Sequence, residues 1–132
     1  MDANTDLNAD LTQRVVTDTN QLDWTPTADP GVERGRLEQD TGQGRATRFL
    51  RFAPGASAAQ HAHDSVEEIY VLEGVFSDDR GDFPAGSYLR NPPGSAHTPR
   101  SEEGCLLFVT LPRPIELLEA DPVDGDPGGA PD

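Results

Sequence analysis

Apolar and polar residues alternate over short stretches of this chain, and glycine or proline separates one stretch from the next. Alternation with a period of two is typical of strands with one buried face. We expect strands at residues 13–16, 32–37, 46–52, 67–74, 75–77, 87–90 and 105–111, with a hairpin turn at 42–44. Only residues 115–119 have helical character. Short strands joined by many turns indicate an all-β sandwich or barrel.

The 132 residues suit one domain, because 13 Gly and 12 Pro favour turns over long helices. Residues 1–10 hold three acids and no base, and residues 119–132 hold five acids and no base. Both ends are also poor in large apolar side chains. We therefore predict disordered acidic tails at 1–10 and 119–132 around a folded domain at 11–118.

The net charge of −14, with arginine as the only basic residue type besides histidine, argues against binding to nucleic acid or an anionic membrane. No apolar run approaches the ~20 residues of a membrane-spanning helix, and the acidic first residues do not resemble a targeting signal. A single Cys excludes an intramolecular disulfide framework. These features together predict a cytoplasmic protein.

Three histidines and one glutamate are the candidate metal ligands. His61 and His63 are two residues apart, so both project from the same face of an extended segment, and Glu67 opens the strongest predicted strand four residues later. His97 follows a turn rich in proline and glycine. Three imidazoles and a carboxylate suit a first-row transition metal. Taken alone, a His-x-His pair is more often an exposed or hydrogen-bonded pair than a metal site.

The residues around these four strengthen the metal hypothesis. Residues 55–74 read G-x5-H-x-H-x3-E-x6-G, and residues 86–97 read G-x5-P-x-G-x2-H. Both patterns resemble the two motifs of the cupin superfamily, except that Ser101 stands where the second motif ends in Asn. Six residues between Glu67 and Gly74 match the cupin spacing, whereas Glu68 would leave five. Adjacent strand residues face opposite ways, so we expect Glu67 inside and Glu68 exposed or paired with an arginine such as Arg90.

The resemblance extends to the ChrR-type cupin domain and its stand-alone relatives over residues 12–112. It rests on the segments 67–79, 83–88, 90–97 and 103–105. It implies a single cupin double-stranded β-helix, a jelly-roll-like barrel of two facing sheets. It also implies one divalent metal (zinc, iron(II), manganese or nickel) held inside by His61, His63, Glu67 and His97.

Three functions follow from this resemblance. The first is a metal-dependent dioxygenase that cleaves a small keto or diketo compound, although diketone-cleaving relatives use three histidines without the acid, so Glu67 departs from their pattern. The second is a sensory or regulatory module of an oxidative stress response. The residues before the motifs hold no Cys or His, so the zinc-binding sigma-factor domain of ChrR is not expected here. The third is a small-ligand-binding cupin without chemistry.

Several other residues allow more than one interpretation. Cys105 is expected to be a buried, unreactive thiol, and a sensing role would require a lowered pKa. Arg48 and Arg51 are expected to face solvent, although either could bind a substrate carboxylate.

Trp24 is interpreted as a packing anchor across one end of the barrel. The aromatic residues expected to fill the core are Phe49, Phe52, Tyr70, Tyr88 and Phe108. Both a monomer and a homodimer stay open, with 13–16 as the candidate edge strand.

Overall fold

The computed structural model describes residues 12, 14–38, 46–62 and 66–111. Within these ranges the chain forms one 3-10 helix, η1, and eleven strands, so the predicted all-β fold is confirmed. The elements are η1 (Thr19–Gln21), β1 (Trp24–Pro26), β2 (Val32–Glu38), β3 (Ala46–Phe52), β4 (Ala56–Ser57), β5 (His61–Ala62), β6 (Glu67–Asp78), β7 (Gly81–Pro84), β8 (Tyr88–Asn91), β9 (Ala96–His97), β10 (Arg100–Ser101) and β11 (Cys105–Leu111).

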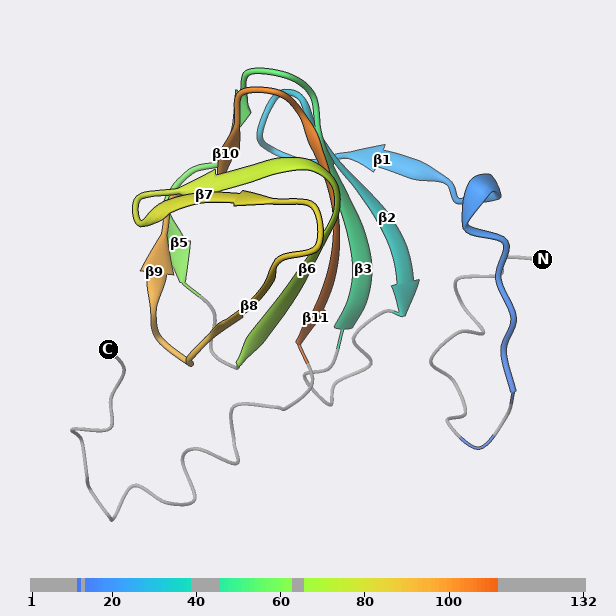
Figure 1. Ribbon diagram of the computed structural model, residues 1–132. Coiled ribbons are helices and arrows are strands. Elements are labelled where there is room, and N and C mark those ends of the chain that lie inside the picture. The colour runs from blue at the N-terminus through green and yellow to red at the C-terminus, as the bar shows by residue number, and fades with distance from the viewer. Residues whose placement is uncertain (1–11, 13, 39–45, 63–65, 112–132) are drawn as a thin grey trace, which may run out of the picture.

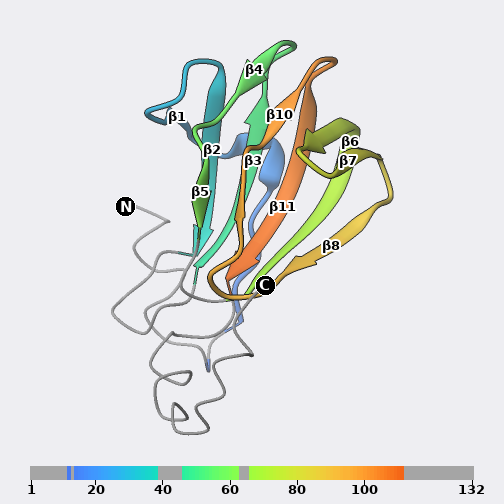
Figure 2. The same ribbon diagram turned by 90° about the vertical axis from the view of Figure 1, so that its left-hand side faces the viewer.

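The strands form a large antiparallel sheet that curls around an interior (Figure 1). Its strands follow the order β1-β2-β3-β11-β6-β10-β4, and β7 and β8 both pair with β6. Strands β5 and β9 form a separate two-stranded sheet. Seen from the side in Figure 2, β2, β3, β11 and β6 lie side by side across the molecule. The long strand β6 therefore connects the two halves of the curled sheet.

Alternating residues of the long strands face the interior and form the core. Strand β11 has a regular buried–half-buried pattern from Cys105 to Val109, as its alternation predicts. The rings of Phe52 and Phe76 meet edge to face, with centroids 6.0 Å apart. The buried cluster consists of Val32, Phe52, Ala56, Ile69, Val71, Phe76, Cys105, Leu107 and Val109.

The opposite face of the sheet carries aromatic residues that the sequence assigned to the core. Tyr70 is 43 % and Tyr88 56 % exposed, so their predicted core positions are wrong. Phe49 and Phe108 are half-buried and pack against each other edge to face, with their centroids 5.5 Å apart. Aromatic residues favour strands on either face, and this explains why residue type alone did not separate the core from the outer face.

The predicted first strand is also wrong. Residues 14–18 form no strand, and Val16 is 79 % exposed. The edge of the sheet is instead β1, which pairs with β2 and places Trp24 opposite Gly35. Dimerisation through an edge strand at 13–16 is therefore not supported, whereas the homodimer itself stays a prediction. Residues 75–77 belong to β6 rather than to a separate strand.

Gly74 allows β6 to continue through an irregularity in its pairing with β11. The register between the two strands shifts between Leu106 and Leu107, and Gly74 has a φ of 77°. A Cβ at this position would overlap the carbonyl oxygen of Gly104. The motif glycine that ends the first cupin-like pattern is thus required by both backbone conformation and space.

Some predicted features lie outside the described residues: the tails at 1–10 and 119–132, the turn at 42–44 and the helical turn at 115–119. In the described part of the chain, no helix has the length and apolar character needed to cross a membrane.

Candidate metal centre

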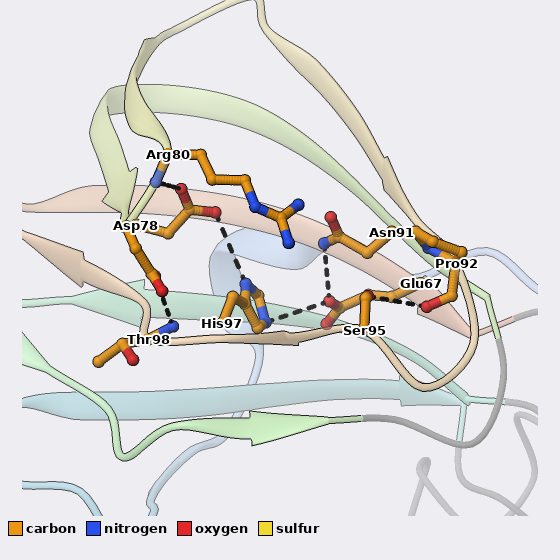
Figure 3. A network of polar contacts seen from close by, with 9 residues as sticks. Glu67, Asp78, Arg80, Asn91, Pro92, Ser95, His97 and Thr98 are labelled. Atoms are coloured by element: carbon orange, nitrogen blue, oxygen red, sulfur yellow. Dashed lines mark hydrogen bonds and ion pairs between the residues drawn. The ribbon is translucent and has the colours of Figure 1, made fainter. Parts of the chain in front are cut away.

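Glu67 and His97 are brought together on the inner side of the curled sheet (Figure 3). Glu67 is the first residue of β6 and is 4 % exposed, and His97 is the last residue of β9 and is 7 % exposed. The Nε2 atom of His97 lies 3.5 Å from Oε1 of Glu67. The adjacent Glu68 lies on the other face of β6, where it accepts a 2.7 Å hydrogen bond from the Tyr88 hydroxyl. The predicted orientations of the two glutamates are confirmed.

A tight turn delivers His97 to this place. The Ser95 amide and hydroxyl both donate to the Pro92 carbonyl, at 3.1 and 2.8 Å, and Gly94 has a φ of 82°. After His97, the Thr98 amide donates to the Asp79 carboxylate at 3.0 Å. This hydrogen bond holds the pKa of Asp79 below its ordinary value, with smaller contributions from other groups. His97 is therefore fixed from both sides along the chain.

Two further residues orient the Glu67–His97 pair, and sequence reasoning missed both. Asn91 lies opposite Glu67 in the β6–β8 register, and its Nδ2 donates to Glu67 Oε1 at 3.2 Å. Asp78 Oδ2 lies 3.7 Å from His97 Nδ1, while its Oδ1 accepts a 2.8 Å hydrogen bond from the Arg80 amide. The position of Asn91 just before the Pro-Pro-Gly turn could have indicated its role. No neighbouring residue in the sequence indicates the role of Asp78.

The other two candidate ligands, His61 and His63, come from the segment before β6. The backbone of His61 pairs with that of His97 in the β5–β9 sheet, which sets position 61 directly across from position 97. His63 lies outside the described residues. Among the residues that the structure describes, no group of three or more His, Cys, Asp or Glu is arranged to hold a metal ion. The structure thus brings together Glu67, His97 and the backbone of position 61.

The spacing of the Glu67 and His97 donor atoms fits two ligands of one metal. Two donors each about 2.1 Å from a metal lie about 3.0 Å apart at an octahedral angle and about 3.4 Å apart at a tetrahedral angle. The observed 3.5 Å is close to the second value. A carboxylate near one imidazole nitrogen, as Asp78 is near Nδ1, is a common arrangement when the other nitrogen binds a metal.

A cavity of about 200 Å³ opens beside this pair. Glu67 and His97 form part of its lining, and most of the rest is apolar, including Leu50, Ile69 and Leu107. Two arginines, Arg34 and Arg48, line it as well. A small pocket with an apolar wall and a few polar groups is typical of a ligand site.

Cys105 and Ser101 are both buried and hydrogen-bonded within the fold. Cys105 is 6 % exposed, and burial raises the pKa of its thiol, with smaller opposing contributions from hydrogen bonds to Ser101 and the Phe52 backbone. This agrees with the expected unreactive thiol. Ser101, which replaces the motif's Asn, is 1 % exposed and donates a 2.6 Å hydrogen bond to the Val75 carbonyl. The departure from the motif therefore retains a buried supporting hydrogen bond.

Solved structures of several kinds share this fold. A chain in the crystal structure of Rhodobacter sphaeroides SigE in complex with the anti-sigma ChrR is 27 % identical, with a TM-score of 0.61 over 71 % of this chain. This chain spans only 51 % of that one. An acetylacetone dioxygenase from Acinetobacter johnsonii is 20 % identical, with a TM-score of 0.64 over 75 % of this chain and 72 % of the other.

The polyketide cyclase RemF from Streptomyces resistomycificus is 18 % identical, with a TM-score of 0.67 over 76 % of this chain and 80 % of the other. No curated protein matches the sequence. The family described as the ChrR Cupin-like domain matches residues 12–113. This match covers most of the sequence and agrees with the curled antiparallel sheet. The chain therefore belongs to the ChrR cupin-like family.

Proposed function

We propose that this protein binds one divalent transition metal through His61, His63, Glu67 and His97, and that it acts as a metal-dependent dioxygenase on a small keto or diketo compound. The observation that carries the proposal is the buried Glu67–His97 pair, whose donor atoms lie 3.5 Å apart at the wall of a ligand-sized cavity. The pairing of position 61 with position 97 supports His61 as a third ligand.

The identity of the metal would decide what chemistry is available. Iron(II), manganese or nickel would supply a Lewis-acidic centre with open coordination positions, whereas four-coordinate zinc would be closed and would mainly stabilise the fold. The adjoining cavity favours a site that admits a ligand. This favours an enzyme over a purely structural metal site.

The surrounding residues have clear tasks under this proposal. Asn91 holds Glu67 in one orientation by its hydrogen bond to Oε1. Asp78 favours a proton on His97 Nδ1, and the lone pair of Nε2 would then be the donor to the metal. The apolar part of the cavity, with Leu50, Ile69 and Leu107, keeps bulk water away from the substrate.

The metal site is tested by elemental analysis of protein purified without added metal, for the wild type and for His61→Ala, His63→Ala and His97→Ala. We expect close to one metal per chain in the wild type and its loss in the histidine variants. Glu68→Ala is the control, because Glu68 lies on the outer face, and it is expected to retain the metal. Stoichiometric metal in both His61→Ala and His97→Ala would end the proposal.

The reaction is tested with an oxygen electrode. Protein loaded separately with iron(II), manganese, nickel and zinc is mixed with acetylacetone or with a small 2-oxo acid, and dioxygen uptake is followed. Uptake that depends on a redox-active metal and disappears in His97→Ala supports the dioxygenase. Tightly bound metal with no uptake in any of these mixtures would reduce the function to ligand or metal binding.

A metal-binding sensory module is the second candidate, and the 27 % identity to a chain of the SigE–ChrR complex favours it. It predicts that peroxide or singlet oxygen releases the metal. The buried Cys105 thiol, with its raised pKa, is a poor first target for an oxidant. Mass spectrometry and metal analysis after oxidation decide this: an unmodified chain with its metal retained excludes sensing.

A further inference from the structure

Two arginines from neighbouring strands line the same cavity as Glu67 and His97. Arg34 lies on β2 and Arg48 on β3, and both belong to the row of residues that faces the interior. The Nε atoms of both guanidinium groups are shielded from solvent. In a chain with 24 acidic residues and ten arginines, two inward-facing arginines in one small cavity require an explanation.

Arg51, three residues after Arg48, shows the contrast. It lies on the outer face of β3, where it forms an ion pair with Glu33, with Nη2 2.7 Å from Oε1, and covers the Trp24 ring at 3.9 Å from its centroid. The side chain of Arg51 thus has an ordinary structural role at the surface. Of the two arginines that the sequence left open as carboxylate ligands, Arg48 lines the cavity.

The acids that line the cavity do not neutralise Arg34. Asp29 accepts a 3.2 Å hydrogen bond from the Ala59 amide, and Glu67 is held by Asn91 and faces His97. Within the described part of the chain, no ion pair joins Arg34 to either acid, and its buried Nε has no hydrogen-bond acceptor. A buried N–H group without an acceptor is unfavourable, so an external acceptor would stabilise it.

We propose that the cavity binds a small organic carboxylate, whose carboxylate group is held by Arg34 and Arg48 and whose other end points toward Glu67 and His97. The guanidinium group is planar and matches the two oxygens of a carboxylate. The cavity volume of about 200 Å³ restricts the ligand to a small acid. The inference rests on the proposed function for its location, since it gives the substrate class of the same site, but anion binding is measured independently of turnover.

The test is titration calorimetry with acetate, pyruvate and succinate at constant ionic strength, on protein with its metal and after chelation. Methyl pyruvate serves as the neutral control for pyruvate. We expect at least one of the three acids to bind, and the ester to bind at least tenfold more weakly than pyruvate if pyruvate is the ligand. Arg34→Gln and Arg48→Gln should each weaken binding at least tenfold without changing the metal content, while Arg51→Gln should bind like the wild type.

Absence of binding by all three acids would overturn the proposal, as would undiminished binding in both Arg34→Gln and Arg48→Gln. Near-ultraviolet circular dichroism of each variant shows whether it is folded. If a glutamine variant is unfolded, Arg34→Lys or Arg48→Lys replaces it, because lysine keeps the charge but loses the bidentate geometry, and weakened binding is again expected. Carboxylate binding by a protein that contains no metal as purified and takes up none when metal is added would refute the proposed function and leave this inference standing.

Discussion

Glu67 and Glu68 are neighbours with the same side chain and opposite surroundings. Glu67 is buried, receives a hydrogen bond from Asn91 and faces His97, whereas Glu68 is bound by the Tyr88 hydroxyl on the outer face. We expect Glu67→Gln to weaken metal binding by at least about tenfold, because a neutral amide does not offset the charge of the cation.

The matched variant Glu68→Gln removes the same charge from the chain and should leave the metal affinity unchanged. Competition with a chromophoric chelator measures both affinities under the same conditions. Equal affinities for the two variants would show that the position of Glu67 at the cavity wall has no bearing on metal binding.

Cys105 gives the stability of the protein a specific dependence on pH. Burial raises the pKa of its thiol above the ordinary value of 9.0. In the unfolded chain the thiol therefore ionises at lower pH than in the folded protein, so the unfolded state loses its proton first. The contribution of this group to the free energy of unfolding is complete below pH 9 and declines as the pH rises from there toward the folded pKa.

Cys105→Ala removes this contribution. We expect the variant to be about 1 kcal/mol less stable than the wild type at neutral pH, because a buried sulfur atom is deleted. Between pH 9 and about 10, its stability should fall less than that of the wild type. Urea unfolding at a series of pH values measures both effects. Parallel pH profiles for the two proteins would contradict a raised thiol pKa.

At the scale of elements, strand β6 depends on Gly74. The residue combines a φ of 77° with a position where a Cβ would meet the Gly104 carbonyl oxygen. Gly55 has a similar φ of 85°, but no atom lies within 4 Å of the place where its Cβ would be. The two glycines therefore separate backbone strain from steric overlap.

We expect Gly55→Ala to cost about 1–2 kcal/mol, from the left-handed backbone alone, and Gly74→Ala to cost at least about 3 kcal/mol, because the β6–β11 ladder must also shift. Chemical denaturation of both variants gives the two values. A smaller loss for Gly74→Ala than for Gly55→Ala would mean that the irregularity in β6 relaxes freely.

The sequence predicted the elements best where alternation was strong. Glu67 inside and Glu68 outside follow from the period of two, and the strand at 105–111 coincides with β11. The same rule did not assign Tyr70 and Tyr88, because an aromatic ring suits both faces of a sheet and alternation does not say which face is covered. Residues 13–16 looked like a strand because Val15 and Val16 are β-branched, yet they have no partner strand among the described residues.

At the scale of the whole molecule, the site depends on contacts between residues far apart in sequence. The motif spacing predicted Glu67 and His97 as partners, and the structure brings them together. It did not predict Asp78 beside His97, or Arg34 in the same cavity, because these positions depend on how the sheet curls and on how β6 pairs with both halves of it. The cavity and the charged groups that line it therefore could not be predicted without knowledge of the fold.

The proposed metal would connect the start of β6 to the small β5–β9 sheet, whose two strands pair with no other strand in the described part of the chain. A ligand that binds only the folded state stabilises it by about 2.7 kcal/mol when its free concentration is 100 times the Kd. We expect this gain to be uneven: hydrogen exchange at Ala96–His97 should slow on metal addition, while exchange in the middle of β11, which pairs on both sides with β3 and β6, should change little. His97→Ala should abolish both the rise in melting temperature on metal addition and the added protection from hydrogen exchange. Protection that increases equally in β9 and β11, or that persists in His97→Ala, would place the metal elsewhere in the molecule.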